Sequence, residues 1–388
     1  MNTNFIYSVP TKIYFGDNQL HHLGDELKQY GKRVLLIYGG GTIKRNGLYD
    51  RITAEIQKAG LELFEMPGVA PNPRHTTVNR GAEICRKEKI DVLLAAGGGS
   101  VIDVAKFVSP ASFYDGDAWD FFTKKAEMTQ FLPVITIPTI SGTGSEMDAY
   151  GIVGNLDTAE KIPLYHPELM PKASFLDPTV TYSVNRYQTA CTAIDSLSHY
   201  LEVYFMKPNL FMLESAMEGF MKTILKYLPV ALEKPTDYEA RANLMWVASW
   251  ALNGFTFGGT NQPFMCHYIA DELSAKYGLT HGLTLAILLP RYLSYTLNEK
   301  SAPIFYSFGC NVLGIDRNLP PMEVGKQVIA RLEDLFFNVC ELPMTLSALG
   351  VDDSRLQDMA RVACRGSVLH GFVDLSKDDI VNIYKMCL

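Results

Sequence analysis

Four side chains in the second half of the chain have the types and spacing of metal ligands. Asp195 and His199 are four residues apart in a segment with helical spacing, which places them on one helix face. His267 and His281 follow, in a chain with only eight histidines. One carboxylate and three imidazoles suit Fe²⁺ or Zn²⁺, whereas Mg²⁺ and Ca²⁺ prefer oxygen ligands. A plain surface Asp–His pair is the alternative interpretation of the first two residues.

Glycine-rich turns in the first half point to a phosphate ligand. The turn at 97–100 (Gly-Gly-Gly-Ser) follows an apolar run and leads into a helical segment. Glycine lets a backbone approach a phosphate closely, and a helix N-terminus offers free N–H groups. A tight strand–helix turn that needs glycine for its geometry alone is the alternative. The hydroxyl-rich segment 141–146 suits closing over a pyrophosphate or a nicotinamide.

An earlier turn, at 39–41, also consists of three glycines. An NAD site usually has an acidic residue at the ribose, whereas this turn is followed by Thr42, Lys44 and Arg45. Two cations there suit a 2′-phosphate, so we expect NADP(H), with NAD as the second possibility. Solvated charges are the alternative. Neither turn matches G-x-G-x-x-G.

The two halves of the chain have different patterns. Short apolar runs alternate with amphipathic segments up to about residue 185, which predicts an α/β domain with a Rossmann-like parallel sheet. Beyond that point most segments have helical spacing and few strand signals. We therefore expect a dinucleotide-binding domain over 1–185 and an all-helical metal-binding and catalytic domain over 186–388. The expected strands are 33–38, 61–66, 92–96 and 133–137, and the expected helices are 48–59, 77–87, 187–205, 212–228, 238–251, 263–277 and 325–340.

Composition excludes several classes of protein. The 388 residues are 47% apolar and 20% charged, which is typical of a globular protein. The net charge of −7 argues against nucleic acid or an anionic membrane as partner. The N-terminal segment lacks the pattern of a secretory signal. Seven widely spread cysteines fit buried free thiols in a reducing compartment, so we expect a cytoplasmic protein.

Taken together, these motifs resemble the iron-containing (group III) alcohol dehydrogenase family over nearly the whole chain. Within the family, segment 38–47 is most similar to NADPH-using butanol dehydrogenases and aldehyde reductases. The matching segments are 10–16 (Pro-Thr-Lys-Ile-Tyr-Phe-Gly), 71–73 (Pro-Asn-Pro), 97–106 (Gly-Gly-Gly-Ser-Val-Ile-Asp-Val-Ala-Lys), 142–146, the set Asp195, His199 and Glu202, and His281-Gly282 leading to Pro290.

The resemblance implies a dehydroquinate synthase-like architecture and hydride transfer between NADP(H) and a small primary alcohol or aldehyde such as butanol or butanal. It implies Asp195, His199, His267 and His281 as ligands of one Fe²⁺ or Zn²⁺. It also implies a homodimer. The cofactor-binding residues expected from the turns and the resemblance are Gly40, Gly41, Thr42, Lys44, Asn72, Gly99, Ser100, Asp103, Thr139, Thr143, Lys161 and Tyr182.

One position departs from the family pattern. Asp271 stands where many members carry a histidine that is regarded as a proton relay. We expect Asp271 to pass the proton, through water, with a charge lining the site as the alternative. Two other functions stay open. One is an NAD-dependent, glycerol-type polyol dehydrogenase of the same fold, and the other is a metal- and nucleotide-binding module without turnover.

Overall fold

The computed structural model describes residues 4–158, 160–207, 210–257, 264–364, 366 and 368–388. By its internal contacts the chain divides into two units, each described by itself below. The sheet unit consists of Ser8–Val184 and Thr236–Asn253, and the helical unit of Met1–Tyr7, Asn185–Pro235 and Gly254–Leu388. Among the described helices, none combines the length and apolar character needed to cross a membrane.

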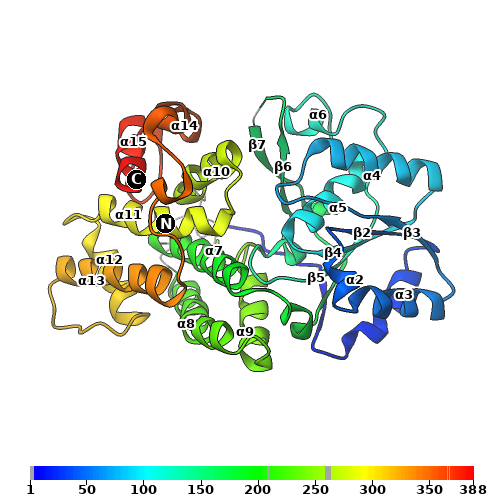
Figure 1. Ribbon diagram of the computed structural model, residues 1–388, viewed down its shortest axis with the longest axis horizontal. Helices are drawn as coiled ribbons and strands as arrows, with labels where there is room; N and C mark the ends of the chain where they lie inside the picture. Colours follow the sequence, from blue (N-terminus) through cyan, green and yellow to red (C-terminus); the bar gives the residue numbers. More distant parts are fainter. Residues whose placement is uncertain (1–3, 159, 208–209, 258–263, 365, 367) are drawn as a thin grey trace. The chain divides into compact units, whose positions relative to one another are not determined.

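Apolar runs form the centre of a six-stranded parallel sheet (Figure 1). Every residue from Val34 to Tyr38 and from Val92 to Gly97 is buried, as expected for strands covered on both faces. The strands follow the order β1-β8-β5-β4-β2-β3. Their bounds are β1 (Lys12–Phe15), β2 (Arg33–Tyr38), β3 (Glu62–Met66), β4 (Val92–Gly97), β5 (Val134–Pro138) and β8 (Ala173–Leu176).

Helices cover both faces of this sheet. Leu35 and Leu93 pack in one core with α4 and α5, whereas Val34 and Val92 pack in a second core with α1 and α3. This alternation follows from the two-residue period of a strand. The helices of the unit are α1 (Leu23–Lys28), α2 (Thr42–Arg45), α3 (Leu48–Lys58), α4 (His75–Glu88), α5 (Gly99–Ala111), α6 (Trp119–Phe122) and α9 (Tyr238–Ser249).

Two parts of the sheet unit differ from the sequence expectations. An antiparallel hairpin of β6 (Tyr150–Asn155) and β7 (Glu160–Tyr165) lies outside the main sheet, where no strand was expected. Helix α9 comes from the second half of the chain, yet Met245 belongs to the core of the sheet unit. The Ser249 hydroxyl of α9 also donates to the carboxylate of Glu146. Its amphipathic pattern predicts a helix but does not say which core the helix joins.

The helical unit is built around α7 (Arg186–Phe205), which is buried over most of its length. Helix α7 packs against α8 and α11, and α10 packs against α11 and α14. A small hairpin of β9 (Val368–Leu369) and β10 (Leu375–Ser376) accompanies them. The other helices are α8 (Phe211–Glu233), α10 (Met265–Tyr277), α11 (His281–Thr296), α12 (Ala302–Asn311), α13 (Pro321–Glu333), α14 (Leu356–Ala363) and α15 (Lys377–Met386).

Several expected helices have different bounds in the structure. Pro263, the expected start of one, lies outside the described residues, and α10 begins at Met265. The expected helix from 325 begins earlier, with Pro320 and Pro321 at the start of α13, where a missing N–H costs nothing. It continues as a π-helical turn over Asp334–Val339. All seven cysteines are buried free thiols.

Polar side chains of α5 hold the sheet unit together. Lys106 is fully buried, and its ammonium donates to Oδ1 of Asp148 (2.7 Å) and to the carbonyl oxygen of Tyr150 (2.7 Å). One turn earlier, the Asp103 carboxylate accepts from the Ser145 hydroxyl (2.7 Å) and the Ile152 amide (3.1 Å). Burial raises the pKa of both carboxyl groups, so their ionised forms depend on these partners.

We predict that Lys106→Met destabilises the sheet unit by about 3–5 kcal/mol, because Asp148 then stays buried without its counter-ion. The measurement is urea unfolding followed by tryptophan fluorescence. All three tryptophans, at 119, 246 and 250, belong to the sheet unit.

The matched control is Lys87→Met, which removes an exposed ion pair with Glu88 and should change the free energy of unfolding by less than about 0.5 kcal/mol. The double variant Lys106→Met with Asp148→Asn should lose less stability than Lys106→Met alone. Equal unfolding midpoints for the wild type and Lys106→Met would contradict the interpretation.

Candidate metal centre and nucleotide-binding turns

Helix α7 carries three buried polar side chains at helical spacing. The Asn185 side chain accepts from the Gln188 amide and caps the helix, which then continues without a break to Phe205. Asp195, His199 and Glu202 follow one another at intervals of four and three residues, so they share a face. All three are at most 6% exposed. Buried polar groups on a central helix call for partners of their own.

Two further helices bring the remaining histidines to this face. His267 lies in the first turn of α10, and His281 is the first residue of α11. The next residue, Gly282, explains how α11 comes so near to α7. A Cβ on Gly282 would stand 2.0 Å from the carbonyl oxygen of Cys191, one turn before Asp195. Glycine is therefore needed at 282 for the close approach that brings His281 to Asp195.

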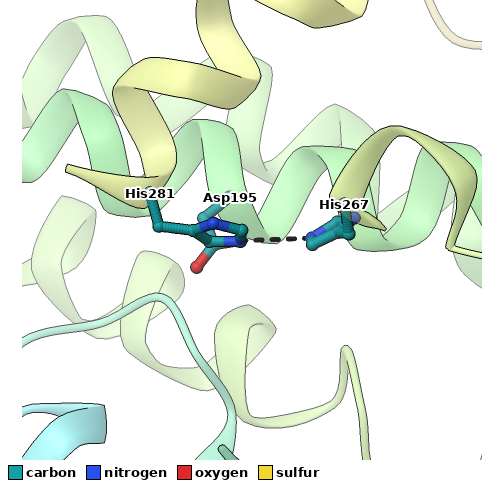
Figure 2. A group of neighbouring side chains, drawn as sticks. All are labelled: Asp195, His267 and His281. Atoms are coloured by element: carbon teal, nitrogen blue, oxygen red, sulfur yellow. Dashed lines mark ion pairs between the residues drawn. The ribbon is translucent and has the colours of Figure 1, made fainter. Parts of the chain in front are cut away.

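The ligand atoms converge on one carboxylate oxygen. Oδ1 of Asp195 lies 3.6 Å from Nε2 of His199, 3.5 Å from Nε2 of His267 and 3.6 Å from Nε2 of His281. Figure 2 shows Asp195, His267 and His281 converging from three helices, and their ligand atoms all lie within 4.8 Å of one another. The His199 ring joins the group by stacking on His267, with centroids 4.4 Å apart.

The distances and the unmade hydrogen bonds fit a bound cation. Within the described residues, neither Oδ1 of Asp195 nor Nε2 of His267 has a hydrogen-bond partner, although both are buried. Such groups are costly unless something else satisfies them. Donors about 2.1 Å from one tetrahedral ion would be roughly 3.4 Å apart, close to the three distances between Oδ1 of Asp195 and the imidazoles. His199 is near Oδ1 but is not part of the group whose ligand atoms all lie within 4.8 Å of one another. The donor set therefore fits a divalent metal.

Charges within the group favour an ionised carboxylate. Burial alone would raise the pKa of Asp195, but the imidazoles of His199, His267 and His281 together lower it. Burial lowers the pKa of His199, which keeps its ring neutral. An ionised carboxylate and neutral imidazoles are the forms that bind metal ions.

Glu202 orients His267 through Nδ1, the ring nitrogen that does not face Asp195. Its Oε1 lies 2.5 Å from Nδ1 of His267, and its Oε2 accepts from the Cys266 amide (2.8 Å). Burial opposes protonation of His267, but Glu202 and Asp195 together outweigh it and raise the pKa of that histidine, so a metal ion would have to displace the proton on Nε2. A carboxylate on Nδ1 holds the proton there and leaves Nε2 to face Asp195. Glu202 belongs to one of the motifs shared with the family but had no expected role, although its spacing from His199 was the available signal.

Asp271 lies on the same side of α10, one turn after His267. Its Oδ1 is 3.6 Å from Nδ1 of His281, and its side chain is 12% exposed. The structure thus brings the expected proton-transfer residue next to an expected ligand. The two acids occupy corresponding places, with Glu202 at Nδ1 of His267 and Asp271 at Nδ1 of His281.

The two glycine turns lie in the sheet unit, after the neighbouring strands β2 and β4, from which the chain connections run in opposite directions. From β2 the chain goes outward to β3, and then returns to β4 on the other side of β2. Ligands of open parallel sheets bind at such a switch point, beyond the carboxyl ends of the strands. The turn at 39–41 follows β2, and Gly97–Gly99 ends β4 and begins α5.

Three of four glycines in these turns, at 41, 98 and 99, are explained by the protein's own backbone and packing. Cβ atoms on Gly98 and Gly99 would approach Ile140 to 2.8 Å and Thr143 to 2.6 Å, so the second turn needs glycine to accept its own neighbouring loop. Gly41 has φ +90°, a left-handed conformation. A Cβ on Gly40 would meet no described atom within 4 Å. Only Gly40 of these four glycines lacks an internal reason, which fits the close approach of a ligand.

The N-terminus of α5 fits a phosphate group. Gly98 occupies the N-cap position and has no side chain with which to cap the 13-residue helix. The Val101 amide donates to the carbonyl oxygen of Gly98, so among the described residues the amides of Gly99 and Ser100 stay available. Ser100 is in this first turn. The Thr139 amide donates to the carbonyl oxygen of Gly97 (3.0 Å), and Thr143 packs on Gly99. The structure thus brings together the expected residues of β4, α5 and the following loop.

The other expected cofactor residues have separate surroundings. Burial raises the pKa of Asp103, and Lys161 of β7 is near enough to offset part of this rise by its charge. Asn72 is exposed with φ +55°, and Tyr182 lies at the end of a short 3₁₀ helix near Tyr238. Asp103 uses both carboxylate oxygens within the protein.

The cations expected at the ribose both have partners. Arg45 folds back over its own turn and donates to Oγ1 of Thr42 (2.9 Å) and to the carbonyl oxygen of Gly40 (3.3 Å). Nζ of Lys44 lies 3.5 Å from the Glu65 carboxylate. Glu65 was missed by sequence reasoning. An acid near the end of the strand that follows the first glycine turn was the signal.

Comparisons with known proteins agree with this geometry. The profile of the iron-containing alcohol dehydrogenases matches residues 10–178, and that of the C-terminal part of the same family matches residues 189–388. NADH-dependent butanol dehydrogenase B of Clostridium acetobutylicum is 43% identical over 98% of this chain and 99% of its own. The NADPH-dependent aldehyde reductase YqhD of Escherichia coli is 32% identical over 91% of each chain.

A solved structure is similar over the whole length. The crystal structure of NADH-dependent butanol dehydrogenase A from Thermotoga maritima superposes with a TM-score of 0.93, at 35% identity, over 99% of this chain and 98% of that one. The expected fold is confirmed by this likeness and by the observed sheet. The chain therefore belongs to the iron-containing alcohol dehydrogenase family, and it is an alcohol/aldehyde oxidoreductase of the kind that uses a nicotinamide cofactor and a metal.

Proposed function

We propose that the protein interconverts a small primary aldehyde, such as butanal, and its alcohol, with NADH and one Fe²⁺ held by Asp195, His199, His267 and His281. The observation that carries the proposal is the convergence of three Nε2 atoms on one buried carboxylate oxygen. The name of the Clostridium relative supports butanal as the first substrate to test. Zn²⁺ fits the same donors, and a glycerol-type polyol is the alternative substrate.

The chain's own residues would prepare the metal site before any substrate arrives. A bound divalent ion supplies Lewis-acid polarisation of the carbonyl oxygen. Asp195 contributes the negative charge, and His199, His267 and His281 contribute neutral donors. Glu202 keeps the Nδ1 proton of His267 in place, so that Nε2 faces inward.

In the sheet unit, the cofactor would be held by backbone groups. The free amides at the start of α5 suit the pyrophosphate, and Ser100 adds a hydroxyl donor. Gly40 leaves room for the adenosine half beside β2. The nicotinamide supplies the hydride, and Thr139 and Thr143 are the expected residues on its side of the turn. Binding of both reactants replaces a chance encounter with an oriented one.

The choice of NADH differs from the NADP(H) expected from the sequence. That expectation depended on Lys44 and Arg45 being free to meet a 2′-phosphate, and both have partners in the structure. The two butanol dehydrogenases described above are named as NADH-dependent, whereas YqhD is named as NADPH-dependent. Partnered cations and the more similar relatives together support NADH.

The test of the proposed function is reduction of butanal, followed at 340 nm. Protein purified without oxygen and loaded with Fe²⁺ should oxidise NADH, lose this activity after chelation and regain it with Fe²⁺. Recovery with Zn²⁺ alone would overturn the choice of iron. Turnover of glycerol but not butanal would favour the polyol alternative, and no turnover with either would contradict the proposal.

We predict that His267→Ala lowers affinity for the metal by at least about 100-fold, since even loss of an outer partner of a ligand costs about 10–100-fold. Metal content and activity should fall together, measured by elemental analysis and the butanal assay. The matched control is His370→Ala, an exposed histidine of the same unit that pairs only with Asp374 in the described residues. Normal metal content in His267→Ala would remove this residue from the ligand set.

We predict that Asp271→Asn lowers kcat by about 100-fold or more at full metal occupancy, as expected for a lost proton-transfer group. The measurement is kcat per bound metal across pH, because loss of a titrating group also flattens one limb of the profile. Asp358→Asn is the matched control, because Asp358 of α14 forms a partly exposed ion pair with Lys276, which lies on α10 as Asp271 does. If metal affinity falls while kcat per metal stays unchanged, Asp271 orients His281 and passes no proton.

A further inference from the structure

Four side chains form a polar cluster beside the turn at 39–41. Glu65, next to last in β3, accepts from the hydroxyls of Tyr38 (2.6 Å) and Tyr49 (2.7 Å). Nζ of Lys44 lies 3.5 Å from the same carboxylate. Residues 38, 44, 49 and 65 belong to β2, α2, α3 and β3, so four elements of one unit meet here. We call them the Glu65 cluster.

The cluster holds the Lys44 charge in place. Its ammonium lies over the Tyr49 ring, 4.3 Å from the centroid, and 5.3 Å from the centroid of Tyr38. The two aromatic rings and the Glu65 carboxylate stabilise the Lys44 ammonium, and the charges of Lys44 and Glu65 cancel. The Lys44 side chain is 48% exposed and that of Glu65 is 34% exposed, so both can be reached by a ligand.

Glu65 is ionised in this setting. Burial acts against ionisation, but the two tyrosine hydroxyls and the Lys44 charge together lower the pKa of the carboxyl group. Both tyrosine hydroxyls donate to Glu65. A ligand on this side of the turn would therefore meet the Glu65 carboxylate, which accepts hydrogen bonds, and Lys44, whose charge that carboxylate neutralises.

The position of Glu65 relates it to the adenosine ribose. In parallel sheets that bind dinucleotides, an acid roughly 20 residues beyond the first glycine turn binds the ribose hydroxyls. Glu65 follows the turn by a similar interval and is 27 residues after Tyr38 at the end of β2. An acceptor there favours a 2′-hydroxyl, whereas a phosphate carrying about −1.5 to −2 charges would be repelled.

We propose that Glu65 determines the preference for NADH by binding Lys44 and keeping its positive charge from the 2′-phosphate of NADP(H). The inference rests on the proposed function, because it assumes that the first glycine turn binds the adenosine half. A 2′-phosphate would have to displace Lys44 from Glu65 and face the carboxylate that remains. Glu65 is therefore a specificity-determining residue and takes no part in the hydride step.

The test is Glu65→Gln, which keeps the size of the side chain and removes its charge. We expect the ratio of kcat/KM for NADPH to that for NADH to rise about tenfold, and Kd for NADP⁺ to fall relative to Kd for NAD⁺ by a similar factor. Both Kd values are measured by tryptophan fluorescence without aldehyde. A second variant, Glu65→Gln with Lys44→Met, should lose the gain, because the released lysine produces it.

The matched control is Glu62→Gln, on the same strand, where the carboxylate pairs with Arg33 (3.1 Å) away from the cluster. It should leave the cofactor ratio within twofold of the wild type. A ratio in Glu65→Gln that equals that of Glu62→Gln, with an unchanged unfolding midpoint, would overturn the inference. If Kd shifts as expected but no variant reduces butanal, the proposed reaction fails and the role of Glu65 stands.

Discussion

A buried carboxylate oxygen that faces three imidazole nitrogens is costly to keep away from water, and three helices of the helical unit meet to form this arrangement. Oδ1 of Asp195 faces three Nε2 atoms at 3.5–3.6 Å and makes no hydrogen bond within the described residues. A soluble helix normally turns such groups to water. Helix α7 instead buries them on all sides, and Gly282 lets α11 approach closely enough to complete the set.

In the sheet unit, the candidate binding site is formed by backbone geometry and not by side-chain ligands. Its parallel strands end in two glycine turns on either side of the switch point, and the uncapped start of α5 lies in the second turn. Two positive charges of this unit have partners within the protein: Asp148 neutralises Lys106, and Glu65 neutralises Lys44. In the first glycine turn the charge of Lys44 is thus offset, whereas Arg45 donates to neutral oxygens of its own turn. Recognition of a phosphate in the second turn would fall to backbone amides.

Some of these features could be predicted from local sequence patterns, and others depend on tertiary packing. Continuous apolar runs identify central strands such as β2 and β4, because both faces are covered. The i, i+4 spacing of Asp195 and His199 puts two ligands on one face, whereas the approach of α10 and α11 depends on tertiary packing that no local pattern contains. The membership of α9 in the sheet unit is hidden for the same reason. Lys44 and Arg45 were visible, but their partners at Glu65 and Thr42 were not. The homodimer and the cytoplasmic location stay predictions.

The candidate ligands come from three helices, and α7 and α10 are distant in sequence, since Glu202 of α7 and His267 of α10 are 65 positions apart. An ion bound there would cross-link α7, α10 and α11, much as a disulfide joins remote segments, but reversibly. By thermodynamic linkage, free ion at a hundred times its Kd adds about 2.7 kcal/mol to the folded state. The supply of metal would then affect the stability of the fold as well as catalysis. It also governs how often these helices separate, and therefore how quickly a protease removes apoprotein in comparison with loaded enzyme.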